Sequence, residues 1–242
     1  MCSTVLSHRR WGICCSGPAG FANVRREHWE GREAGGVRIA NRVRASSTVP
    51  SIGATYDTEP PVRRLRPVLV GGSELQGVVH RFLDAHEDER GTFTEVYADH
   101  WTTGIEPRQW SLVHSVTGAL RGMHLHRRHA EYVSVVRGRL SVGLYDARPG
   151  APTEGRWARY DLADDTPSFL TFPAGFVHGW LAHEPTTHLQ AVSEPYVDYA
   201  EDDNLGCHWA DPALGIEWPF APTVVAPPAA SFPSLDELLS RV

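Results

Sequence analysis

The sequence predicts an all-β fold, a jelly-roll barrel with one short C-terminal helix. Short runs rich in β-branched and aromatic residues recur from about residue 66 onward. Turn-forming pairs such as Arg137-Gly138 and Pro149-Gly150 separate these runs. A helical period is predicted only at the end of the chain. Many short strands at near-regular spacing are typical of an antiparallel double-stranded barrel.

The elements follow one another between residues 66 and 242. The expected strands cover residues 78–82, 92–97, 132–136, 140–145, 158–162, 168–172 and 188–192. For the helix, Ser234 and Glu237 have the spacing of a capping box, and Leu235, Leu238 and Leu239 supply an apolar face. We find no internal repeat, so we expect residues 66–242 to form a single barrel domain.

Residues 1–65 differ in composition from the rest of the chain. They are rich in Arg, Gly and Ser and show no sustained period of 2 or 3.6 residues. We interpret them as a disordered extension or as the product of a start site assigned too early; a transit peptide is the weaker alternative. Cys2, Cys14 and Cys15 lie here, and only Cys207 lies in the barrel. A disulfide framework is therefore not expected, which favours a cytoplasmic location.

Charge and composition exclude several classes of function. The 242 residues include 23 basic and 29 acidic side chains, which gives no reason to expect binding to nucleic acid or to a membrane surface. All basic residues are arginine, so Schiff-base chemistry through lysine is excluded and arginine must bind any phosphate. No apolar run approaches the roughly 18 residues that span a bilayer.

Four side chains form a pattern typical of metal sites. His124 and His126 are two residues apart and so project from one face of a strand, and Glu131 and His178 complete a set of nitrogen and oxygen ligands. The set predicts a divalent metal ion, either Fe, Zn, Mn or Ni, and no organic cofactor. The alternative is a hydrogen-bonded polar cluster without a metal. Burying a glutamate beside three histidines without a cation is costly, which favours the metal.

Several sequence blocks occur in a fixed order between residues 80 and 219. They include DERGTFTE at 88–95, GALRGMH at 118–124, VVRG at 135–138, PAGFVHG at 173–179 and WADPALGIEWP at 209–219. Together they resemble the dTDP-4-dehydrorhamnose 3,5-epimerase family, whose members are homodimers with the cupin double-stranded β-helix fold. The resemblance implies the same fold, a homodimer and a nucleotide-sugar substrate.

The resemblance also assigns roles to individual residues. His124 matches the general base and Asp211 the aspartate that orients it. The positions that match nucleotide- and diphosphate-binding residues are Arg90, Phe93, Glu95, Gln109 and Arg121, and Tyr199 matches an aromatic residue packed against the base. In the family, the base removes a proton α to the C4 keto group of a 4-keto-6-deoxy sugar, and reprotonation from the opposite face inverts the carbon.

Three positions depart from the family pattern. Ser193 replaces the catalytic tyrosine, Glu131 replaces an active-site lysine, and His126 replaces a glutamine two residues after the base. The last two changes create the metal-ligand pattern. No general acid is visible unless Tyr196 moves into the space at Ser193, and His129 is expected on a solvated loop with Arg127 and Arg128.

We therefore expect a 3- or 3,5-epimerase or related isomerase of deoxysugar or antibiotic biosynthesis, metal-assisted if the ion is present. In that metal-assisted version His124 cannot both bind the ion and act as base through the same nitrogen. The alternatives are a metal-dependent cupin oxygenase, another metal-assisted enzyme acting on a small molecule, and a cupin that binds sugar nucleotides without catalysis.

Overall fold

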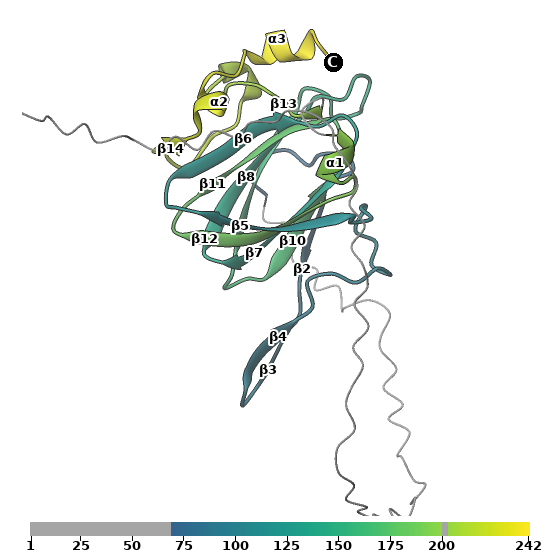
Figure 1. The fold of residues 1–242 in the computed structure, drawn as a ribbon, viewed down its shortest axis with the longest axis vertical. Coiled ribbons are helices and arrows are strands. Elements are labelled where there is room, and N and C mark those ends of the chain that lie inside the picture. The colour runs from purple at the N-terminus through teal and green to yellow at the C-terminus, as the bar shows by residue number, and fades with distance from the viewer. Residues whose placement is uncertain (1–68, 200–202) are drawn as a thin grey trace, which may run out of the picture. The chain divides into compact units, whose positions relative to one another are not determined.

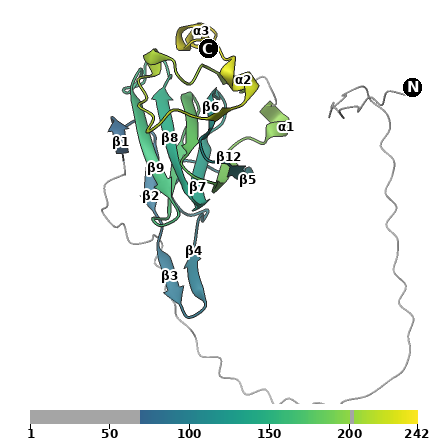
Figure 2. The same cartoon turned by 90° about the vertical axis from the view of Figure 1, so that its left-hand side faces the viewer.

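Two antiparallel sheets face each other in the computed structural model, which describes residues 69–199 and 203–242 (Figures 1 and 2). The larger sheet has the order β1 (Leu69–Gly72), β9 (Trp157–Ala163), β8 (Arg139–Asp146), β11 (Phe176–Ala182), β6 (Ala119–Leu125) and β13 (Leu205–Gly206), with β14 (Val224–Val225) parallel to β6. The smaller sheet has the order β2 (Val79–Phe82), β10 (Ser168–Phe172), β7 (Glu131–Arg137), β12 (Thr186–Val192) and β5 (Gln109–Ser115). The predicted all-β jelly roll is confirmed. The extension predicted for residues 1–65 lies outside the described residues.

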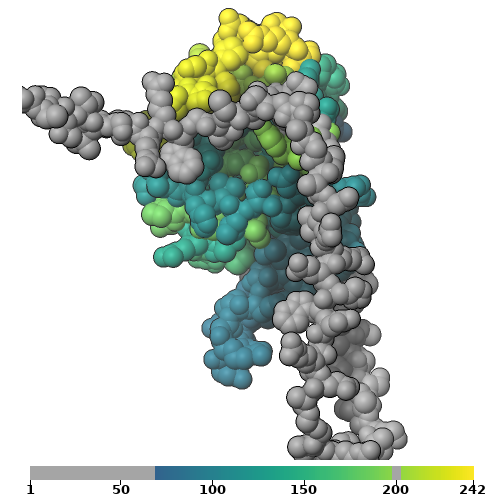
Figure 3. Space-filling model, viewed as in Figure 1, coloured from purple at the N-terminus to yellow at the C-terminus, as the bar shows by residue number. Residues whose placement is uncertain are grey.

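The remaining elements lie at opposite ends of the barrel. Strands β3 (Ala85–Asp88) and β4 (Gly91–Thr94) form a separate hairpin. The short helices are α1 (Tyr196–Tyr199), the 3-10 helix η2 (Pro212–Leu214), α2 (Pro227–Ala230) and α3 (Leu235–Leu239). Figure 3 shows the C-terminal segment packed over one end of the barrel, while the hairpin stands clear of the other end.

The space between the sheets holds the main core. Leu140, Val142 and Leu144 of β8 are fully buried there against Val133 of β7 and Leu170 of β10. Burial of this kind supplies most of the favourable free energy of folding. The outer face of the larger sheet is also covered, because the C-terminal segment packs against it. Strands β8 and β11 are therefore buried on both faces.

The predicted elements agree with the structure in most places. Strand β10 matches the predicted range 168–172, and α3 has the predicted capping box, in which the Ser234 and Glu237 side chains each accept a backbone N–H. Strand β4 ends at Thr94 rather than at Tyr97. Strands β5 and β11 were not among the predicted ranges, and a glycine interrupts the alternation in β11. The strand expected to carry His124 and His126 is β6, which ends at Leu125, one residue before His126. None of the helices in the described ranges is long and apolar enough to cross a membrane.

Candidate functional site

A cavity of about 240 Å³ lies between the two sheets. Its walls come from β5, β6, β7, β11, β12 and the segment after β12. The lining residues are Val113, Arg121, His124, His126, Glu131, His178, Trp180, Gln190, Tyr196 and Asn204. The structure therefore brings the predicted base and the four predicted metal ligands to one cavity, together with one predicted phosphate-binding arginine.

A β-bulge in β6 aims the side chains of Arg121 and His124 at this cavity. His178 of β11 pairs with His124, but the next residue, Gly179, pairs with Gly122, so Met123 is an extra residue without a partner in the ladder. In a regular strand, residues three apart point to opposite faces. Here both residues line the cavity, while Met123 packs fully buried in the core cluster of the outer face.

Beside the bulge, β6 and β11 approach each other closely through two glycines. A Cβ atom on Gly122 would lie 2.6 Å from Cα of Gly179 and 2.7 Å from the carbonyl oxygen of His178. Gly122 also has φ +122, a region that L side chains rarely adopt. The glycine pair thus sets the strand separation next to His124 and His178.

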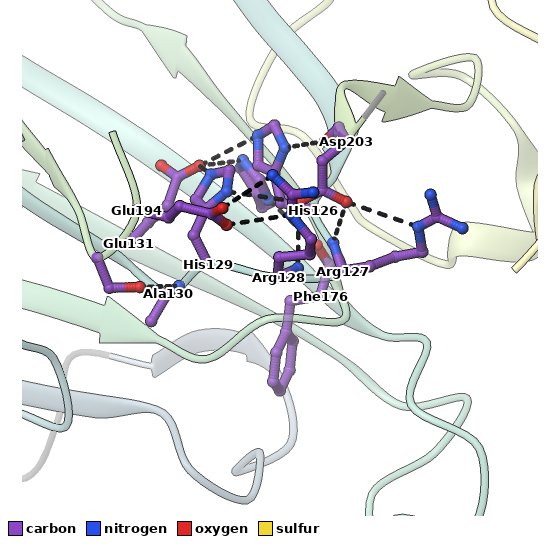
Figure 4. Close-up of polar contacts among 11 residues, drawn as sticks. His126, Arg127, Arg128, His129, Ala130, Glu131, Phe176, Glu194 and Asp203 are labelled. Carbon is purple, nitrogen blue, oxygen red and sulfur yellow. Dashed lines mark hydrogen bonds and ion pairs between the residues drawn. The ribbon is translucent and has the colours of Figure 1, made fainter. Parts of the chain in front are cut away.

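Glu131 lies at the centre of a group of histidines. Its Oε1 atom is 3.1 Å from Nε2 of His178 and 3.3 Å from Nε2 of His126. Nε2 of His129 is 3.8 Å away, and the Nε2 amide of Gln190 donates to the other carboxylate oxygen at 2.9 Å. The Glu131 side chain is 1% exposed, and Figure 4 shows His126 and His129 beside it. Ligand atoms of His126, Glu131 and His178 all lie within 4.8 Å of one another.

Backbone carbonyls fix the orientation of two of these imidazoles. Nδ1 of His126 lies 2.5 Å from the carbonyl oxygen of Asp203, and Nδ1 of His178 lies 3.1 Å from that of Phe176. A carbonyl oxygen can only accept, so each Nδ1 carries the hydrogen. In the neutral imidazole the lone pair is then on Nε2, which faces Glu131.

Burial and mutual charge decide the protonation of the site. Burial is the largest single influence on Glu131 and raises its pKa, but the surrounding histidines His178, His129 and His126 together outweigh it, so the carboxyl pKa lies well below its usual range. Burial is the largest single influence on His178 and lowers its pKa, yet the Glu131 carboxylate and the Phe176 carbonyl together raise that pKa above its usual value. Burial, reinforced by neighbouring histidines, lowers the pKa of His124 and of His126 to about 4. His124 is therefore neutral at pH 7 and able to accept a proton.

His129 is buried, contrary to the expected solvated loop. Its side chain is 0% exposed, and its Nδ1 lies 3.5 Å from the carboxylate of Asp203. That carboxylate also accepts the backbone N–H groups of Arg127 and Arg128. Asp203 thus fixes the turn between the ligand-bearing strands, a role that no motif in the sequence indicated. The side chains of the two arginines are about half exposed, as expected for a loop.

The expected pairing of Asp211 with His124 does not occur in the described structure. Oδ1 of Asp211 accepts from the backbone N–H of Ala213 at 2.9 Å, and Oδ2 accepts from that of Leu235 at 2.7 Å. Its carboxylate therefore fixes the starts of η2 and α3. Within the described residues, Nδ1 of His124 is buried and has no hydrogen-bond partner.

The other residues implied to bind substrate are divided between two regions. Arg121 lines the cavity, and Oε1 of Gln109 accepts from the backbone N–H of Tyr196 on the cavity rim. The hairpin carries Arg90, paired with Asp88, and Phe93, which is 64% exposed; Glu95 follows it. None of these three is among the cavity-lining residues given above. The side chain of Tyr199 lies outside the described residues.

Ser193 and Tyr196 are the two residues that bear on the position of the expected acid. The Oγ atom of Ser193, which replaces the expected tyrosine, accepts from the backbone N–H of Ala130 at 2.9 Å. Tyr196 lines the cavity together with His124. Gln190, Trp180 and Asn204 also line it and were missed. The only available signal was the alternation in the predicted strand 188–192, which places His188 and Gln190 on one face.

Comparisons with known proteins agree on one family. The family model described as dTDP-4-dehydrorhamnose 3,5-epimerase matches residues 72–237. A dTDP-4-dehydrorhamnose 3,5-epimerase of Sinorhizobium fredii is 33% identical over 190 residues, covering 70% of this chain and 95% of that protein. A dTDP-4-dehydrorhamnose 3-epimerase of Streptomyces niveus is 31% identical, covering 68% of this chain and 80% of its own.

Solved structures show the same likeness. The rmlC epimerase of Mycobacterium tuberculosis superposes with a TM-score of 0.63 at 28% identity, covering 71% of this chain and 91% of that chain. A 4-keto-6-deoxy sugar epimerase from the novobiocin gene cluster of Streptomyces spheroides also gives 0.63, at 27% identity, covering 74% and 94%.

Proposed function

Because the chain belongs to the dTDP-4-dehydrorhamnose 3,5-epimerase family, we propose that it epimerises a nucleotide-linked 4-keto-6-deoxy sugar at C3 or at both C3 and C5. One observation carries the proposal: a neutral histidine and an arginine face the same cavity from a single bulged strand. The arginine is suited to a diphosphate and the histidine to a carbon acid, the two ends of such a substrate.

His124 is the general base of the proposed reaction. The C–H bond α to the keto group breaks, the proton passes to the imidazole, and the electron pair forms an enolate across C4 and its oxygen. A proton delivered to the opposite face of the α carbon, C3 or C5, then restores the C4 ketone and inverts the configuration of that α carbon. General base catalysis of this kind contributes roughly 10²- to 10⁴-fold to the rate.

Tyr196 is the proton donor in this proposal. The hydroxyl of Ser193 accepts from the backbone, and its short side chain cannot replace a phenol. Tyr196 lines the cavity with His124, and Gln109 holds its backbone N–H at 2.9 Å. A phenol that lines the same cavity as the base supplies the second proton that inversion requires.

Arg121 binds the diphosphate. Its Nε donates to Oγ of Ser115 at 3.1 Å, and one terminal nitrogen donates to the carbonyl oxygen of His114 at 3.0 Å. These bonds fix the plane of the guanidinium, and its other N–H groups remain available for phosphate oxygens. Ordering the guanidinium in advance reduces the entropy lost on binding.

We also infer that two copies of the chain form a homodimer, which acts in the cytoplasm. Strand β5 is the edge of the smaller sheet and exposes Trp110 (42%) and Leu112 (56%). The hairpin separately exposes the Phe93 side chain. A dimer through the β5 edge buries Trp110 and Leu112, and the family resemblance implies that Arg90 then reaches toward the partner's cavity.

The activity is tested by proton NMR in D₂O with a dTDP-linked 4-keto-6-deoxy sugar. We expect deuterium at C3, or at C3 and C5. In His124→Asn the rate of deuterium incorporation should fall by about 10²- to 10⁴-fold. His183→Asn is the control, because this histidine bonds Ser141 and is not among the cavity-lining residues. In Tyr196→Phe, net inversion should fall more than exchange. A wild-type protein that exchanges neither position in any such sugar refutes the proposal.

A further inference from the structure

We propose that His126, Glu131 and His178 form a site for one divalent transition-metal ion and that His124 stays outside its ligand set. The three side chains are buried; His126 directly follows the end of β6, His178 lies on β11 of the same sheet, and Glu131 begins β7 of the other sheet. The donors are two imidazole nitrogens and one carboxylate oxygen. This combination suits Zn²⁺, Fe²⁺, Mn²⁺ or Ni²⁺.

The first argument comes from the direction of the lone pairs. The carbonyls of Asp203 and Phe176 hold the Nδ1 hydrogens of His126 and His178, so both Nε2 lone pairs face the Glu131 carboxylate. When both rings are neutral, three acceptors converge on one buried point, and this arrangement is unfavourable unless a proton on His178 or a metal ion lies among them. A carbonyl behind each imidazole is also the usual support of a histidine that binds metal.

The second argument comes from the distances. Ligands about 2.1 Å from one metal ion lie about 3.0 to 3.4 Å from each other in octahedral or tetrahedral geometry. Glu131 Oε1 is 3.1 Å from Nε2 of His178 and 3.3 Å from Nε2 of His126. These separations are also short enough for hydrogen bonds. Yet Oε1 is buried and makes no hydrogen bond of acceptable geometry with any described residue.

The third argument concerns which histidines take part. The atoms of His126, Glu131 and His178 lie within 4.8 Å of one another, and within the described ranges His124 does not belong to that group. The His124 ring lies 6.2 Å from that of His126 and 6.3 Å from that of His178, whereas these two are 5.2 Å apart. The expected four-ligand set is thereby reduced to three. A histidine is left to act as base, and coordination positions are left open.

The chemical role of the ion rests on the proposed function: a bound ion would act as a Lewis acid that polarises the C4 keto oxygen of the sugar. The site itself rests only on the geometry of the three side chains. Metal binding and deuterium exchange can therefore fail independently of each other.

The test is elemental analysis of the full chain, produced without chelators and without a metal-binding tag. We expect about one transition-metal ion per chain. Stripped protein titrated with Co²⁺ should show the visible absorption bands of a cobalt–histidine site. Glu131→Gln and His126→Gln preserve side-chain volume and should each weaken Co²⁺ binding by at least about 100-fold, more than the loss of a supporting group costs.

The control is His86→Ala, which removes an exposed histidine on β3 and should leave binding unchanged. Circular dichroism of each variant separates loss of the site from loss of the fold. The inference is overturned if the wild-type chain binds no metal at stoichiometric concentration. It is equally overturned if folded Glu131→Gln and His126→Gln retain wild-type affinity, because the ion would then lie elsewhere.

Discussion

Replacing Gly122 by alanine tests whether close approach of β6 and β11 builds the site. The new Cβ would lie 2.6 Å from Cα of Gly179 and 2.7 Å from the carbonyl oxygen of His178. Both neighbours are backbone atoms, so no side chain can rotate away, and the two strands must separate.

The matched control is Gly91→Ala in the hairpin. Gly91 has φ +126, close to the +122 of Gly122, and a Cβ there would meet no described atom within 4 Å. The two variants thus share the backbone cost of a positive φ, on the order of 1–3 kcal/mol. Gly122→Ala adds overpacking, which costs a further ~1–3 kcal/mol. A difference of this size corresponds to roughly 2–12 °C in Tm for a domain of this length.

Urea unfolding at one protein concentration, followed by tryptophan fluorescence, measures both variants. We expect a lower free energy of unfolding for Gly122→Ala than for Gly91→Ala, with equal slopes against urea. Because His124 and His178 flank the glycine pair, deuterium exchange should also fall in Gly122→Ala. If Gly122→Ala is as stable as Gly91→Ala or more so, the strands are not in the close contact described, and the reasoning is refuted.

Three further predictions concern single side chains. Burial lowers the pKa of His80 to about 4 against 6.5 for an unburied histidine, so between these pH values the unfolded chain binds more protons. His80 alone should lower the free energy of unfolding by about 3 kcal/mol as the pH drops from 6.5 to 4, so His80→Phe should reduce the slope of stability against pH in urea melts, to which His124 and His126 also contribute. Burial also raises the pKa of the Cys207 thiol to about 12, so iodoacetamide should label this residue only after unfolding, as peptide mass spectrometry can show. Labelling of Cys207 in the folded chain would contradict its burial. Asp211→Ala removes two backbone hydrogen bonds and should cost ~1–2 kcal/mol in thermal unfolding. If Asp211→Ala leaves the stability unchanged but abolishes deuterium exchange into the sugar, then Asp211 acts by pairing with His124 and not by capping the helices.

Much of the fold could be predicted from the sequence because the local preferences of the residues agree with the tertiary structure. The capping box at Ser234 and the strand 168–172 depend on short-range patterns that the barrel keeps. Strands β6 and β11 were harder to predict, because their glycines serve the contact between strands and weaken the alternation. Their pairing depends on residues more than 50 positions apart.

The residue types of the candidate site could be predicted from the sequence, but their geometry could be predicted only in part. The spacing of His124 and His126 indicated one face of a strand, and both line the cavity. The spacing could not show that His124 lies apart from the other three ligands. Nor could it show that Asp203 and His129 complete the surroundings, because these contacts depend on a turn folding back onto the barrel.

The unpaired residue Met123 sets the phase of β6. Removing it would leave a regular ladder with β11 and would turn either Arg121 or His124 out of the cavity. The anion-binding group and the proton-accepting group are thus coupled through the length of the strand rather than through any contact between them. Substitutions can weaken each group separately, whereas a one-residue deletion at this position should remove one of the two while leaving every side chain of the site chemically intact.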